Sequence, residues 1–122
     1  MSAPHLLLGQ AGEHLAIDYL QKKGYRIEAQ NVRLGKGEID LIAWEHPRLL
    51  VFIEVKTRRT GHFGGPEEAV TVRKQKRIAR TAGLYMEQIG YEWAVRFDVI
   101  AIVWEKNKTP QLQHFEDAFF WM

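Results

Sequence analysis

Two strongly apolar segments near the middle of the chain constrain its fold most. They span residues 38–44 and 50–56, and the second reads Leu-Val-Phe-Ile-Glu-Val-Lys, which is rich in β-branched and aromatic side chains. The five residues between them, 45–49, include Pro47 and have the length of a hairpin loop. The pattern therefore predicts two neighbouring antiparallel strands.

The rest of the chain alternates between helical and extended patterns. Residues 9–23 predict a helix, because apolar side chains form one stripe from Leu15 to Leu20 and Gly24 follows as a helix-ending glycine. The other predicted elements are a strand at 25–30, a helix at 67–89 in one or two pieces, an apolar strand at 95–104 and an edge strand at 111–115. This order predicts an α/β fold, a mixed β-sheet flanked by α-helices.

Length and composition place the chain among ordinary globular proteins. Its 122 residues and 46% hydrophobic content suit one domain over 1–122, with 1–8 as a flexible or loosely packed N-terminal segment. The absence of cysteine excludes disulfides, thiolate metal sites and cysteine nucleophiles. No apolar run reaches the roughly 20 residues that span a bilayer, and a secretion signal is lacking, so we expect a cytoplasmic protein without a membrane partner.

Charged side chains interrupt the two apolar strands, where burying charge is costly. Side chains alternate along a strand, so Glu54 and Lys56 share one face. A symmetric hairpin pairs Trp44 with Leu50 and places Asp40 opposite Glu54. Opposed residues have Cβ atoms about 4.5–5.5 Å apart, and two carboxylates at that distance repel unless a cation lies between them.

A divalent metal ion supplies that charge better than Lys56 alone. Mg²⁺ prefers carboxylate oxygens, keeps several waters and is usually held by one or two carboxylates plus a substrate phosphate. This arrangement suits phosphodiester hydrolysis, in which a metal activates a bound water and Lys56 orients that water or stabilises the developing charge. The alternative is a structural ion-pair network in which Lys56 neutralises Asp40 and Glu54.

The longer motifs around these residues resemble a known family. Residues 37–43 (Gly-Glu-Ile-Asp-Leu-Ile-Ala) and 51–58 (Val-Phe-Ile-Glu-Val-Lys-Thr-Arg) resemble the Asp…Glu-x-Lys signature of the restriction-endonuclease-like superfamily. More closely, the chain resembles the YraN family of predicted endonuclease-like proteins, which is similar to archaeal Holliday-junction resolvases. The resemblance covers nearly the whole chain from Gly9 onward, through residues 9–13, 24–25, 31, 65–70 and 96–99.

The resemblance implies a restriction-endonuclease-like mixed sheet and an endonuclease that hydrolyses DNA with Mg²⁺, or with Mn²⁺ as a substitute. It implies Asp40, Glu54 and Lys56 as the core of the site. It also implies Glu13 as a third metal ligand beside Asp40 and Glu54, although Glu13 alone would be interpreted as a solvated helix carboxylate. Resolvase resemblance extends the expected substrate to branched or structured DNA. Resolving a symmetric four-way junction needs two sites, hence a homodimer.

Other polar residues have two interpretations each. Gln75 lies on the inward stripe of the helix at 67–89, where it either helps position the catalytic water or bonds to the backbone. Asp98 interrupts an apolar strand, and we expect it to be structural, bonded to the backbone or to Arg96. The five histidines show no metal-ligand spacing.

Cations crowd the middle third of the chain, which indicates a polyanionic partner such as nucleic acid. Arg58 and Arg59 directly follow the candidate site and are candidates to grip a DNA backbone. A second group on one face of the helix at 67–89 forms either a solvated basic face or a phosphate-binding one. This group is Arg73, Lys76, Arg77 and Arg80.

Two classes of function remain. The first is a metal-dependent endonuclease. The second is a non-catalytic nucleic-acid-binding or scaffold module that retains the nuclease fold. A binding module has no need to keep Asp40, Glu54 and Lys56 together, and this chain keeps all three.

Overall fold

The two apolar segments form the antiparallel pair predicted for them, β2 (Gly37–His46) and β3 (Leu49–Arg58). Trp44 lies opposite Leu50, as the symmetric hairpin predicts. The connection is shorter than the predicted loop at 45–49, because both strands extend into it and a shift in register takes up the irregularity. Together the strands form the middle of the sheet.

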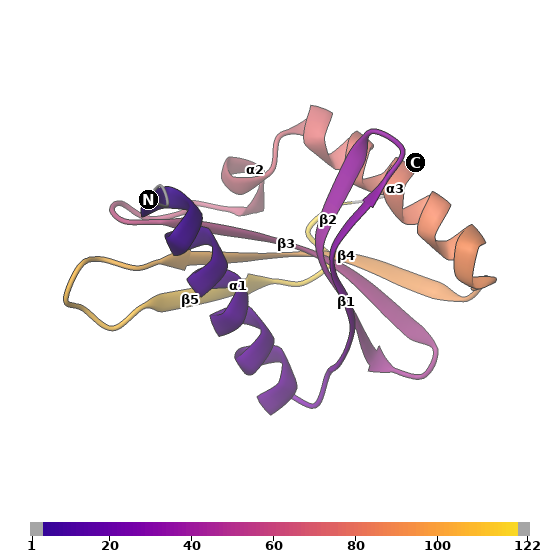
Figure 1. Cartoon of the computed structure of the whole chain (residues 1–122), viewed down its shortest axis with the longest axis horizontal. Helices are drawn as coiled ribbons and strands as arrows, with labels where there is room; N and C mark the ends of the chain where they lie inside the picture. Colours follow the sequence, from indigo (N-terminus) through magenta and orange to yellow (C-terminus); the bar gives the residue numbers. More distant parts are fainter. Residues whose placement is uncertain (1–3, 120–122) are drawn as a thin grey trace.

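The computed structural model describes residues 4–119 and shows an α/β fold, a five-stranded mixed sheet with helices packed against it (Figure 1). The strands lie in chain order, β1-β2-β3-β4-β5. The remaining elements are α1 (Pro4–Lys22), β1 (Arg26–Leu34), α2 (Pro66–Ala69), α3 (Val72–Ile89), β4 (Ala94–Val103) and β5 (Gln111–Phe115). β3 and β4 are parallel, because the chain crosses over between them through α2 and α3.

Helix and strand boundaries differ from the prediction at the N-terminal side of the chain. α1 begins at Pro4 rather than at residue 9, so part of the predicted N-terminal segment 1–8 is helical, and residues 1–3 lie outside the described chain. β1 is longer than the predicted strand at 25–30 because it pairs with β2 as far as Leu34 opposite Gly37. The helical region at 67–89 is in two pieces, and the edge strand lies where it was predicted.

Apolar side chains pack on both faces of the sheet, which explains why its inner strands are apolar throughout. Leu50 and Phe52 point toward α3, and Val51 and Ile53 point toward α1. All four side chains are buried. Each face of β3 is therefore covered by a helix, and charged groups on this strand find water only near its end.

Two glycines let the helices approach the strands near that end. A Cβ atom at Gly12 of α1 would collide with the Oγ1 atom of Thr57 on β3. A Cβ atom at Gly37 of β2 would collide with the Oγ1 atom of Thr81 on α3. Side chains from α1 and α3 can therefore reach the same strand ends. Within the described residues, no helix is long and apolar enough to cross a membrane.

Candidate active site

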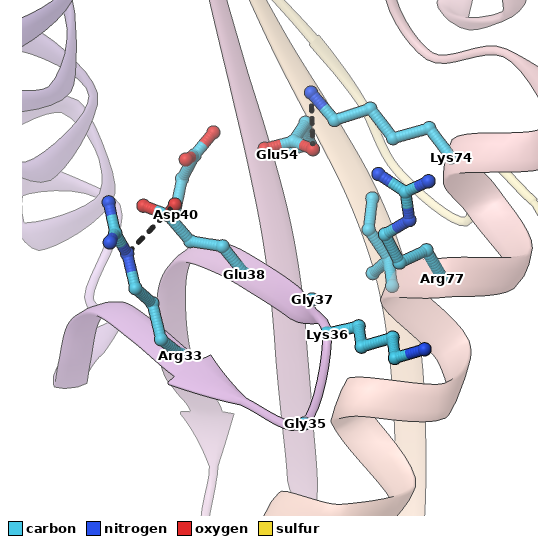
Figure 2. Close-up of a pocket in the computed structure, with 10 residues that line it drawn as sticks. Arg33, Gly35, Lys36, Gly37, Glu38, Asp40, Glu54, Lys74 and Arg77 are labelled. Carbon is cyan, nitrogen blue, oxygen red and sulfur yellow. Dashed lines mark ion pairs between the residues drawn. The ribbon is translucent and has the colours of Figure 1, made fainter.

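An open pocket of about 470 Å³ lies between the β1–β2 hairpin and the N-terminal half of α3 (Figure 2). Its lining combines anionic groups on the strands with cationic groups on the hairpin and the helix. The charged lining residues are Arg33, Lys36, Glu38, Asp40, Glu54, Lys74 and Arg77. The pocket therefore holds two of the predicted site residues, Asp40 and Glu54, inside a frame of positive charge.

Asp40 and Glu54 meet where the β2–β3 ladder ends. The last paired residues are Leu41 and Ile53, and the next step along each strand places Asp40 against Glu54, as predicted. The Oδ2 atom of Asp40 accepts a hydrogen bond from the backbone N–H of Val55 at 2.8 Å. The Asp40 carboxylate thus accepts from a backbone N–H that strand pairing leaves without a partner, and this hydrogen bond fixes the position of the carboxylate.

The Glu54 carboxyl group is buried, with 5% of the residue exposed. Burial, followed by the hydrogen bond and the charge of Asp40, raises the pKa of Glu54 to about 9. Lys74 opposes this rise without cancelling it. The Oε2 atom has no hydrogen-bond partner among the described residues, although the Nζ atom of Lys74 lies 3.1 Å from it in an ion pair.

The cation beside Glu54 is Lys74, in the first turn of α3, and not the predicted Lys56. Lys56 lies two residues after Glu54 on the same face of β3, but it is exposed and does not line the pocket. Lys74 is held in place because its backbone N–H donates to the Oγ1 atom of the N-cap Thr71. Sequence reasoning missed Lys74; the signal that could have found it is its spacing four residues before the buried Ile78, which places both on one side of the helix.

Glu13 reaches this region from α1. It is half-buried, and its pKa is raised by burial and by the charge of Asp40, while a hydrogen bond from Asn31 lowers it. Glu38 raises it further. The structure therefore brings Glu13 into the electrostatic neighbourhood of Asp40, from an element distant in sequence.

Of the other predicted residues, Arg77 lines the pocket and the rest lie around it. Gln75 donates from its Nε2 atom to the backbone oxygen of Val70 at 3.1 Å, which holds the junction between α2 and α3. Of the basic residues on α3, Arg77 lines the pocket. Those that are exposed outside it are Arg73, Lys76 and Arg80.

Arg58 ends β3 and Arg59 directly follows it, and both interact with neighbouring elements. The guanidinium of Arg58 lies 4.1 Å from the centroid of the Phe63 ring. Arg59 donates to the backbone oxygen of Trp104 at 3.3 Å. Both side chains help to order the loop after β3, and Arg59 remains exposed to solvent.

The donor set of the pocket fits a hard divalent cation. Asp40 and Glu54 line the pocket and offer carboxylate oxygens, which Mg²⁺ and Mn²⁺ prefer, whereas Glu13 lies outside its lining and acts on Asp40 through its charge. Glu54 Oε2 is buried with the Lys74 ammonium group 3.1 Å away, and a carboxylate oxygen can accept a further partner beside it. Burial, and after it the charge of Asp40, raises the pKa of both Glu54 and Glu13, and a bound cation would oppose that rise.

A second polar cluster surrounds Asp98 beneath α1, and it is satisfied by the protein itself. The Nε and Nη2 atoms of Arg96 each lie 2.8 Å from an Asp98 oxygen, which confirms the predicted bond between these residues. His114 Nε2 is 2.7 Å from Oδ2, and the backbone N–H of Asp117 donates to Oδ1. Burial alone would raise the pKa of Asp98, but the hydrogen bonds from His114 and Arg96 outweigh it and lower the pKa.

Asp98, His114 and Glu116 lie close enough together to hold a metal ion. However, both oxygens of Asp98 are already occupied by the guanidinium of Arg96. His114 Nδ1 is in turn 3.0 Å from the hydroxyl of Tyr19, which ties α1 to the sheet. The cluster therefore has a structural role, as was expected for Asp98.

The chain belongs to the uncharacterised protein family UPF0102, whose family model matches residues 12–102. It is 48% identical to a UPF0102 protein of Rhodococcus jostii over 118 residues, which are 96% of this chain and 99% of the relative. It is 52% identical to one of Symbiobacterium thermophilum over 96 residues, 78% of this chain and 80% of the relative. A third, of Thermodesulfovibrio yellowstonii, is 46% identical over 113 residues, 93% of this chain and 96% of the relative.

Proposed function

We propose that this protein is a metal-dependent endonuclease that hydrolyses DNA phosphodiester bonds at the pocket between the β1–β2 hairpin and α3. The observation that carries the proposal is the meeting of the half-buried Asp40 with the buried carboxyl group of Glu54, at a pocket framed by cations. The Asp…Glu-x-Lys pattern and the mixed sheet support placement in the restriction-endonuclease-like superfamily.

In this proposal Asp40, Glu54 and Glu13 hold Mg²⁺, or Mn²⁺ in its place. The bound metal would polarise the phosphoryl oxygen and supply an activated water at neutral pH. The protein fixes the carboxylates beforehand, since Val55 holds Asp40 and the sheet buries Glu54. Preorganised groups of this kind cost no reorganisation at the moment of reaction.

The cations around the pocket would hold the substrate backbone. Arg33 and Lys36 lie on the hairpin, and Arg77 faces them from α3 (Figure 2). Arg58, Arg59, Arg73 and Lys76 extend positive charge beyond the pocket, along the path proposed for the flanking DNA. Lys56, exposed on the Glu54 face of β3, is proposed to orient the attacking water or stabilise charge on the phosphate.

The test is a cleavage assay on linear, single-stranded, flapped and four-way DNA with Mg²⁺, Mn²⁺ or a chelator. We expect metal-dependent cleavage that Asp40→Asn abolishes and that Lys56→Ala lowers by about a hundredfold or more. Glu92→Gln is the matched control, because Glu92 is exposed and distant in sequence from the site. Cleavage that survives both site substitutions would show that the assigned residues are wrong. A preference for four-way DNA would support the resolvase-like substrate and a dimer.

A non-catalytic DNA-binding module is the second candidate, favoured by the ion pair that Glu54 already makes with Lys74. If Glu54 serves only to pair with Lys74, the Glu54 carboxylate is neutralised by the protein and needs no metal. Binding of DNA by the wild type and by Asp40→Asn alike, without cleavage under any metal condition, would favour the module.

A further inference from the structure

The charge of Lys74 can act on two groups, the Glu54 carboxylate and an anion in the pocket. Figure 2 shows its side chain extending from α3 to Glu54, with its Nζ atom 3.1 Å from Oε2. The same side chain lines the pocket that the cations frame. Its Glu54 partner is almost fully enclosed, whereas half of the Lys74 side chain is exposed. The carboxylate is therefore fixed and the ammonium group is the movable member of the pair.

The contact between them joins one ammonium group to one carboxylate oxygen, with Nζ 3.1 Å from Oε2. A lysine that contacts a carboxylate through one atom is held less firmly than an arginine that makes two parallel hydrogen bonds to a carboxylate. Arg96 binds Asp98 in this second way. The backbone of Lys74 is anchored by the Thr71 cap, so movement is confined to the flexible four-carbon side chain.

From this geometry we infer that Lys74 is a displaceable internal cation: it neutralises Glu54 in the metal-free protein, leaves Oε2 when a divalent metal takes that oxygen, and then meets a substrate phosphate. The inference rests on the proposed function, because it requires the metal proposed there. Lys74 is thus a positioning residue for Glu54 in one state and a phosphate contact in the other. Loading of the metal would thereby increase the affinity of the pocket for a polyanion.

The experiment follows the accessibility of each lysine in the wild-type protein by limited acylation and mass spectrometry, with chelator or with Mg²⁺. We expect metal to raise the acylation rate of Lys74 by about threefold, a modest change because half of its side chain is already exposed in the ion pair. Lys76, exposed on the same helix, is the control for general effects. Lys36, which lines the same pocket without an ion pair among the described residues, controls for the added charge of the metal.

Calorimetry with Mg²⁺ alone separates failure of the inference from failure of the proposed function. If the wild type binds Mg²⁺ and Lys74 acylation does not change, the inference is overturned and the metal site stands. If neither the wild type nor Lys74→Met binds Mg²⁺, both are overturned. Tighter Mg²⁺ binding by Lys74→Met than by the wild type would support the inference, since it would show that the lysine and the metal compete for Oε2. Binding by Lys74→Met but not by the wild type would overturn it, because the metal would then not displace the lysine.

A second arm adds a short DNA duplex to the Mg²⁺-loaded wild type. We expect the duplex to protect Lys74 from acylation again, by about threefold, while the chelator-treated protein shows no such protection of Lys74. Protection of Lys76 alone would contradict the phosphate contact. Lys74→Arg keeps the charge, so its affinity for the duplex with metal should stay closer to the wild type than that of Lys74→Met.

Discussion

The backbone N–H of Val55 donates to the Oδ2 atom of Asp40 at the point where β2 and β3 stop pairing. The side chain of Asp40 therefore provides the acceptor that the backbone of β2 no longer provides at this point. The end of β3 depends on an oxygen atom at this position. Asp40→Asn keeps an oxygen acceptor and removes the negative charge. This substitution is the one that tests the charge without opening the strand end.

We predict that Mg²⁺ stabilises the folded protein through these carboxylates. A ligand present at a hundred times its dissociation constant adds about 2.7 kcal/mol to the free energy of unfolding. The wild type and the control Glu92→Gln should gain that stability, Glu13→Gln should gain less, and Asp40→Asn should gain none. Thermal unfolding with Mg²⁺ and with chelator measures it. An equal gain in Asp40→Asn would place the metal elsewhere.

The pH dependence of stability follows from the raised pKa of Glu54. A carboxyl group whose pKa is higher in the folded than in the unfolded state stabilises the fold at low pH, and this contribution is lost as the pH rises from 4.5 toward about 9. We expect the wild-type free energy of unfolding, without metal, to fall across this range by about 1 to 3 kcal/mol more than that of Glu54→Gln. Denaturant titrations at several pH values test this. Parallel curves for the two proteins would refute the assignment.

Close packing of α1 on β3 predicts a large difference between two neighbouring glycines. Gly12→Ala should destabilise the protein by about 1 to 3 kcal/mol, because its new methyl group collides with Thr57 Oγ1. Gly9→Ala meets no atom within 4 Å and should be neutral or stabilise α1 by up to about 1 kcal/mol. Thermal unfolding compares the two. Adding Thr57→Ala to Gly12→Ala should restore much of the loss, and an unchanged loss would exclude this contact as its cause.

The buried ion pair of Arg96 and Asp98 should dominate stability over exposed pairs. Asp98→Asn removes the charge that Arg96 and His114 surround, and breaking a buried pair costs about 3 to 5 kcal/mol. The Arg33–Glu38 pair lies on the surface, with 81% of the Arg33 side chain exposed. Arg33→Ala should therefore cost less than about 1 kcal/mol. Urea unfolding of the two variants gives the comparison, and similar losses would contradict it.

DNA binding should distinguish the two arginines that lie three residues apart on α3. Arg77 lines the pocket and Arg80 does not. In metal-free buffer we expect Arg77→Gln to weaken binding of a DNA duplex and to lower the slope of log affinity against log salt by about one. Arg80→Gln should change the slope less. Equal effects would indicate a diffuse basic surface rather than a phosphate position at the pocket.

Much of the fold was predictable because the strong signals are local. The apolar strands specify a hairpin, and Trp44 pairs with Leu50 as predicted, because a register shift between Trp44 and His46 compensates for the shorter connection. Strand alternation was enough to predict that Asp40 meets Glu54. The extent of β1 was not predictable in this way, since its second half is exposed at alternate positions and is ordered by pairing with β2.

The identity of the cation beside Glu54 depends on how the helix packs on the sheet. Sequence spacing placed Lys56 near Glu54, but a side chain two positions along an exposed strand end points to solvent. Lys74 arrives from α3 because Gly37 allows that helix to lie close to β2. A contact between elements so far apart in sequence requires the packing angle, which no local pattern supplies.

The parallel pairing of β3 with β4 sets an order in which the site can assemble. The β2–β3 hairpin is local and closes a short loop, whereas β4 must wait for the whole crossover through α2 and α3. Loop length alone therefore favours the meeting of Asp40 and Glu54 before Lys74 is held beside them. Until the helix docks, the two facing acids lack the ammonium group of Lys74, so dissolved cations and protons take a larger part in neutralising them.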